Sequence, residues 1–249
     1  NRAGLIKNTL EKINAEGEKY GSSSEGAGRT ICIDYSSVNV AKPFHIGHLS
    51  TTVIGGALYR LYKFLGYNAV GINHLGDYGT QFGKLIYAYK HWGNPEEVEK
   101  GGVQELTRLY VRYHKESEND SSMDDEERRY FKLIENGDEE CVKLFNLFKE
   151  ITLKEVRKIY DELDIKFDSY AGESFYNDKM QPVIDELKEK GLLVESEGAQ
   201  IVDLEKYGMP PCIILRSDGA SLYATRGLAA ACYRKAHYDF DKCLYVVAY

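Results

Sequence analysis

Two histidines three positions apart, His45 and His48, carry the strongest chemical signal in this sequence. They enclose Gly47 and stand where the pattern predicts the start of a helix. A helix N-terminus offers N–H groups and partial positive charge to phosphate, and residues at i and i+3 share one helix face. A glycine between them lets a flat base approach the backbone. The spacing therefore predicts a site for a nucleoside triphosphate, bound by His45, Gly47 and His48.

Lys42 lies three residues before the first histidine and places an ammonium group near the same pocket. A plain surface lysine is the alternative, but the turn constrained by Pro43 favours a phosphate role. Lys42, His45 and His48 would then stabilise charge on an α-phosphate and a departing pyrophosphate. Capping or core roles remain open for the two histidines. We predict no metal site, because no third His or Cys ligand lies nearby.

Three further motifs have plain structural interpretations, and for the first two a role in the site stays open. Asn39 is a helix cap or turn residue, or a site residue. The run 76–79, which contains Asp77, is a tight turn or part of the site. The run Ser217–Arg226 reads as a hairpin turn followed by a helix start, with Thr225 as its N-cap.

The elements that must position these residues form a strand–helix–strand pattern. Residues 31–35 predict a buried strand, and residues 46–65 predict a helix that ends at Gly66. Residues 69–73 predict the next strand, followed by a helix from about Thr80. Such a unit implies parallel strands, whose ligands bind beyond the carboxyl ends. The two histidines lie at one such end.

The rest of the chain predicts a sheet in two halves. Residues 1–92 form the first half, residues 93–198 a mainly helical insertion, and residues 199–249 a second, truncated half. Strands at 212–215 and 243–247 and a helix at about 226–237 mark that second half. The predicted fold class is α/β, a Rossmann-like parallel sheet with a nucleotide-binding site, split by the insertion.

Composition narrows the class of protein. The net charge of −7 argues against nucleic-acid binding through the whole surface but allows a local basic face. We expect a cytoplasmic protein with no membrane partner, because the sequence has no signal peptide and no apolar run of membrane-spanning length. The chain begins at Asn1 and ends within an apolar run, so we expect a fragment of a longer protein. We expect a monomer.

Residues 36–49, SSVNVAKPFHIGHL, resemble the signature region of class I aminoacyl-tRNA synthetases, specifically the arginyl-tRNA synthetases. Three later segments agree with that family: HLGDYGTQF at 74–82, SDGASLYATR at 217–226 and DKCLYVV at 241–247. The resemblance extends from Leu5 to the end of the chain, and its motifs are specific.

The resemblance implies a Rossmann-like catalytic domain that activates arginine with ATP and transfers it to tRNA-Arg. Mg²⁺ would arrive with ATP rather than be held by the protein, and tRNA would bind mainly through domains outside this chain. The helical segment would be the connective insertion of the family. By position, the arginine-binding residues would be Ser37, Asn39, His48, Tyr223 and the residue at Gly227.

Gly227 departs from the family pattern, which usually has an aspartate there. That aspartate would pair with the guanidinium of the substrate, a charge-assisted contact worth about 1.5–3 kcal/mol. Two alternatives stay open. The chain is an inactive or incomplete fragment that only binds nucleotide or tRNA, or it is a small-molecule nucleotidyltransferase, since that superfamily also places His-x-Gly-His at a helix start.

Overall fold

A three-stranded parallel sheet in the order β2-β1-β6 forms the centre of the fold, and helix α2 joins two of its strands. The structure is a computed structural model that describes residues 2–217 and 223–247. The elements concerned are β1 (Thr30–Asp34), α2 (Ile46–Phe64), β2 (Asn68–Ile72) and β6 (Lys242–Tyr245). The predicted strand–helix–strand unit with parallel strands is confirmed, and its bounds move by only one residue.

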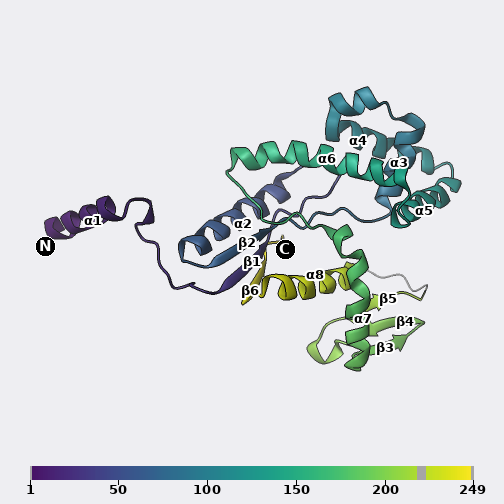
Figure 1. Ribbon diagram of the computed structural model, residues 1–249. Coiled ribbons are helices and arrows are strands. Elements are labelled where there is room, and N and C mark those ends of the chain that lie inside the picture. The colour runs from purple at the N-terminus through teal and green to yellow at the C-terminus, as the bar shows by residue number, and fades with distance from the viewer. Residues whose placement is uncertain (1, 218–222, 248–249) are drawn as a thin grey trace.

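Both faces of the sheet are covered. Ile31, Ile33 and Tyr35 point to one face, where α2 and the later helix α6 (Glu139–Glu162) pack. Cys32 points to the opposite face, as the two-residue period of a strand requires, and packs beside Tyr238 of helix α8 (Tyr223–Tyr238). Figure 1 shows α2 and α8 on opposite sides of the sheet.

Between β2 and α8 the chain is mainly helical. Helices α3, α4, α5 and α6 share one apolar core, which includes Phe82, Leu106, Tyr130 and Phe148. In Figure 1, α3, α4 and α5 lie together at the upper right, and α6 extends from them toward α2. The remaining helices and 3-10 turns are α1 (Arg2–Glu16), η1 (Gly17–Lys19), α3 (Gln81–Trp92), α4 (Pro95–Ser117), α5 (Ser122–Glu135), η2 (Glu173–Lys179), α7 (Met180–Glu189) and η3 (Glu205–Tyr207).

One strand of the predicted parallel sheet belongs elsewhere. The strand β5 (Cys212–Leu215) pairs antiparallel with β4 (Ala199–Val202), which pairs with β3 (Leu193–Ser196). Ile214 is fully buried and Ile213 is 42% exposed, the one-sided burial of an antiparallel sheet. The prediction that residues 212–215 join the parallel sheet was therefore wrong, because a short apolar run does not identify its neighbour.

Strands β3 and β4 form a hairpin at the position where we expected the helical insertion to end. The expected boundary between residues 198 and 199 falls in the turn of this hairpin. Glu197 and Gly198 both have positive φ, at 51° and 80°, as a two-residue hairpin turn favours.

Helix α8 begins earlier than predicted. Its first described residue is Tyr223, so Thr225 lies within the helix and is not its N-cap. The Thr225 hydroxyl instead donates a 2.5 Å hydrogen bond to the carbonyl of Ile214, joining α8 to β5. Residues 218–222 of the predicted turn lie outside the described residues.

None of the helices in the described part of the chain is long and apolar enough to cross a membrane. Helix α1 contains no buried residue and lies apart from the sheet in Figure 1.

The close approach of α2 to β1 gives a stability prediction. A Cβ added at Gly55 would lie 2.2 Å from Tyr35 Cβ, and Tyr35 is fully buried. We expect Gly55→Ala to lower the free energy of unfolding by about 1–3 kcal/mol through overpacking, measured by urea denaturation. Gly4→Ala in α1 is the control, because its added Cβ meets nothing within 4 Å and we expect a gain of about 0.5–1 kcal/mol. Equal effects of the two variants would contradict the packing argument.

Candidate active site

The two histidines hold each other at the first turn of α2. His45 is the N-cap residue, with extended backbone at φ −135° and ψ 175°. Its ring Nδ1 accepts a 3.1 Å hydrogen bond from the Gly47 N–H, and its own N–H donates to His48 Nδ1 at 3.3 Å. The two rings stack with centroids 3.8 Å apart. The predicted pair therefore lies together at a helix N-terminus.

These hydrogen bonds fix where the ring protons lie. In a neutral imidazole one nitrogen accepts while the other carries the proton. Because Nδ1 accepts a backbone N–H in both rings, we assign the proton of each neutral ring to Nε2. Each histidine then has an Nε2–H available to donate to an anion.

Burial keeps His48 neutral. The side chain is only 8% exposed, and its pKa falls from 6.5 to about 4. Desolvation is the main cause, followed by the charges of His45 and Lys42. Lys42 itself is exposed and within electrostatic reach of His48. At neutral pH, His48 is thus a hydrogen-bond donor without charge.

The loop between β1 and α2, together with the first turn of α2, forms residues 35–48, here called the histidine loop. It carries three non-glycine residues in left-handed backbone. Ser36, Ser37 and Ala41 have φ of 69°, 48° and 60°, a costly conformation that surrounding contacts must maintain. Ser37 donates a 2.8 Å hydrogen bond to Asp34, and the Ala41 N–H donates to the Thr152 hydroxyl of α6 at 2.9 Å.

Asn39 lies at the junction of two loops. It forms a parallel bridge with Gly76, and an added Cβ at Gly76 would come within 2.3 Å of Asn39 Oδ1. The loop 36–41 and the loop 73–79 therefore lie side by side beyond the carboxyl ends of β1 and β2. Ser37, Asn39, Lys42 and His45 lie on the β1–α2 loop at this edge, and His48 lies in the first turn of α2 that follows it.

Tyr223 and Gly227 lie on a different element, the first turns of α8. The Tyr223 side chain is 74% exposed. Among the described residues, Tyr223 makes no hydrogen bond or ring contact with the histidine loop. A Cβ added at Gly227 would meet nothing within 4 Å, so the position is open to a larger residue. Next to it, Arg226 is buried and stacks over the Tyr78 ring at 3.7 Å.

Sequence reasoning missed two charged groups, Glu173, whose pKa the charge of Arg226 affects, and Arg234 of α8. Glu173 begins η2, and its pKa is raised by burial, although the charge of Arg226 opposes the rise. The sequence did offer a signal for Glu173. It is an isolated carboxylate in the segment 170–176, which contains three aromatic residues, whereas the carboxylates of residues 116–140 stand among many others.

The second missed group is Arg234 of α8, whose side chain is 1% exposed. Its Nη1 lies 2.8 Å from Asp34 Oδ2 at the end of β1, and its Nη2 lies 3.3 Å from His74 Nδ1. Burial alone would lower the pKa of Arg234, and the Asp34 carboxylate outweighs it, so the pKa is raised. Burial also lowers the pKa of His74. No sequence signal separates this arginine from surface arginines.

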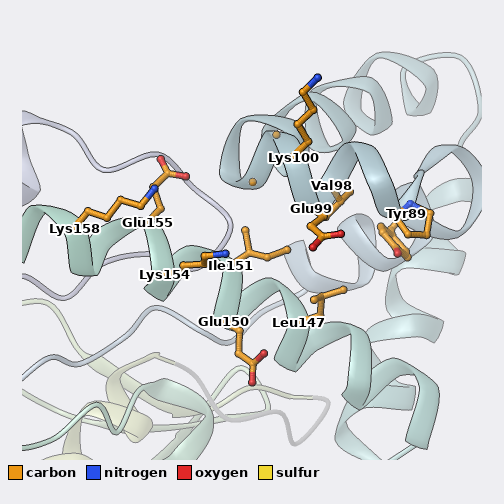
Figure 2. A pocket seen from close by; sticks show the side chains of 13 residues that line it. Tyr89, Val98, Glu99, Lys100, Leu147, Glu150, Ile151, Lys154, Glu155 and Lys158 are labelled. Atoms are coloured by element: carbon orange, nitrogen blue, oxygen red, sulfur yellow. The ribbon is translucent and has the colours of Figure 1, made fainter.

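A cavity of about 520 Å³ lies elsewhere, between α4 and α6. Lys100, Lys154 and Lys158 line it together with Glu99 and Glu150 (Figure 2). None of the predicted site residues lines this cavity. In the described part of the chain, no group of three or more His, Cys, Asp or Glu side chains is arranged to hold a metal ion.

The chain is similar in sequence to one family of known proteins. Residues 9–249 match the family described as "tRNA synthetases class I (R), catalytic domain". The arginine–tRNA ligase of Clostridium beijerinckii is 59% identical over 243 residues, which are 98% of this chain and 43% of that protein. The corresponding protein of Clostridium perfringens is 57% identical over 246 residues, covering 99% and 44%. The chain thus spans less than half the length of these relatives.

A solved structure agrees with these relatives. The crystal structure of arginyl-tRNA synthetase from Plasmodium falciparum has a TM-score of 0.73 and 31% identity. The match covers 94% of this chain and 39% of that one.

The lowered pKa of His48 predicts how stability depends on pH. Between pH 6.5 and about 4 the unfolded state binds a proton that the folded state does not, so stability falls as pH falls through this range. We expect the wild-type chain to lose up to about 3 kcal/mol more than His48→Gln between pH 7 and pH 4, in denaturant titrations. Identical losses for both proteins would show that His48 is not held neutral.

Proposed function

Because the chain belongs to the catalytic-domain family of class I tRNA synthetases for arginine, we propose that it activates arginine with ATP and transfers it to tRNA-Arg. The arginine carboxylate attacks the α-phosphorus of ATP, forming arginyl-adenylate and releasing pyrophosphate. A hydroxyl of the terminal tRNA adenosine then attacks the carbonyl carbon, and AMP leaves. The observation that carries the proposal is the pair of stacked histidines at the start of α2, whose Nδ1 atoms accept backbone N–H groups and leave Nε2 to donate, within a chain matched from residue 9 to its end.

The histidine loop supplies the ATP half of the reaction. Phosphoryl chemistry asks the protein for positioning and charge stabilisation rather than covalent catalysis. His45 and His48 donate Nε2–H to phosphate oxygens, and the exposed Lys42 adds a full positive charge. His48 is already neutral and oriented, so it pays little reorganisation cost when charge develops. Mg²⁺ arrives bound to ATP.

The arginine half rests on the loop 36–41 and on α8. Ser37, Asn39 and His48 contact the amino acid, and Tyr223 lines the guanidinium side. Gly227 leaves the first turns of α8 without the aspartate usual in the family. Glu173, next to Arg226, is the half-buried carboxylate that remains for the guanidinium on this side.

Binding without catalysis is a second candidate function, and Gly227 is the observation that favours it. The site would then bind arginine too weakly for activation, while it would still bind the nucleotide. The similarity to arginine–tRNA ligases weighs against a small-molecule nucleotidyltransferase. We also propose that the protein acts as a monomer in the cytoplasm and meets tRNA mainly through regions outside this chain.

Ligand binding tests the proposal directly. We expect calorimetry to detect binding of ATP and of arginyl-sulfamoyl-adenosine, a stable analogue of arginyl-adenylate. His48→Ala should weaken ATP binding about 10- to 100-fold, since it removes a hydrogen bond to a charged group. His91→Ala, at an exposed histidine of α3, is the matched control and should bind ATP normally. If neither ATP nor arginyl-sulfamoyl-adenosine binds at millimolar concentration, the proposal is wrong.

Gly227 offers a gain-of-function test. The position has room for a side chain, so we expect Gly227→Asp to fold normally and bind arginyl-sulfamoyl-adenosine about 10- to 100-fold more tightly. ATP affinity should stay unchanged. Gly227→Asn has the same shape without the charge and should gain little. An equal gain from Asn, or no gain from Asp, would contradict a guanidinium contact at this position.

A further inference from the structure

The loop after β2 is held between two other segments. On one side, the Gly76 N–H donates to the Val38 carbonyl at 2.9 Å and the Val40 N–H donates to the Gly76 carbonyl at 3.1 Å. On the other side, the Glu173 N–H donates to the Leu75 carbonyl at 2.9 Å. The loop 73–79 therefore connects the histidine loop to the segment that returns from the helical insertion.

The Asp77 side chain adds hydrogen bonds between the loop 73–79 and the segment that returns from the insertion. The residue is fully buried, and its carboxylate accepts three hydrogen bonds. Ser174 donates two of them, from its N–H at 2.9 Å and from its hydroxyl at 2.8 Å. Lys149 Nζ of α6 donates the third at 2.7 Å. Such bonds to an ionised acceptor are about twice as strong as neutral ones.

The segment that Asp77 holds also contacts the start of α8. Asn177 of η2 accepts a 3.3 Å hydrogen bond from Arg226 Nε. Tyr78, the residue after Asp77, stacks against the guanidinium of the same arginine. The loop 73–79, η2 and the first turn of α8 thus contact one another, and Glu173, the first residue of η2, is bonded to the loop through its N–H. Loss of the hydrogen bonds between Asp77 and Ser174 would therefore free the neighbouring Glu173 to move.

We infer that Asp77 is a positioning residue for arginine recognition: it fixes Ser174, and through it the neighbouring Glu173 carboxylate, against α8. Lys149 completes the arrangement from the insertion, so this helix contributes to the amino-acid side of the site without touching substrate. The inference rests on the proposed function. It concerns how the chain distinguishes arginine, and leaves the histidine loop as the holder of ATP.

The test compares two ligands that differ only in the amino-acid side chain. Glycyl-sulfamoyl-adenosine lacks the guanidinium of arginyl-sulfamoyl-adenosine, and we define the discrimination ratio as the Kd of the glycyl ligand over that of the arginyl ligand. We expect Asp77→Asn to lower this ratio about tenfold while the Kd of the glycyl ligand stays the same. In a Glu173→Gln background, Asp77→Asn should lower the ratio no further, because both changes act through one carboxylate.

A double variant and a helix control separate positioning from folding. Asp77→Asn combined with Lys149→Met removes both charges, leaves neither buried alone, and should behave like Asp77→Asn. Lys154→Met, at an exposed lysine of the same helix, should leave the ratio unchanged. If Asp77→Asn weakens both ligands equally, Asp77 has only a structural role and the inference is wrong.

Amide hydrogen exchange tests, without any ligand, whether Asp77 holds Ser174 and η2 in place. Asp77→Asn should speed exchange at Ser174 and in η2 at least tenfold, with the first turn of α2 unaffected. Unchanged exchange would overturn the inference. A wild-type chain that binds neither ligand, or binds both equally, would contradict the proposed function instead, and the exchange result would still stand.

Discussion

A buried ion pair between Arg234 and Asp34 joins the two parts of the chain on which the site depends. Asp34 is the last residue of β1, and its other carboxylate oxygen accepts the Ser37 hydroxyl at the start of the histidine loop. Arg234 belongs to α8, the helix that carries Tyr223 and Gly227. Removing one partner of such a pair costs about 3–5 kcal/mol, because the other charge is left buried and alone. A change at either residue alone would therefore weaken the attachment of α8 to the sheet.

The histidine loop is ordered by a second constraint, the demand of a helix end for hydrogen-bond partners. The first N–H groups of a helix have no acceptor within the helix. Here the imidazole of His45 supplies one acceptor, and the imidazole of His48 accepts from the residue that precedes the helix. One set of contacts therefore both completes the helix end and orients the two rings.

The sequence was informative where structure is local. The bounds of β1, α2 and β2 and the placing of the two histidines at a helix start followed from spacing and hydrophobic period, because neighbouring residues decide those features. The partner of β5 did not follow, since four apolar residues suit either sheet. Glu173 and Arg234 were missed for a related reason. Their importance comes from Arg226, Asp34 and His74, which lie far away in sequence and meet them only in the folded chain.

The segment that returns from the insertion has a consequence for self-association. Strand β2 lies at one edge of the parallel sheet, and an unpaired strand edge invites pairing with another molecule. Asp168 and Ser169 donate their N–H groups to the Gly71 carbonyl, and the Ser169 carbonyl accepts from Asn73, so this segment lies along the C-terminal end of the outer edge of β2. A shortened chain that lacked the insertion would uncover that edge and expose a template for intermolecular β-sheet growth. The insertion therefore also covers part of the sheet edge at which another molecule could otherwise pair.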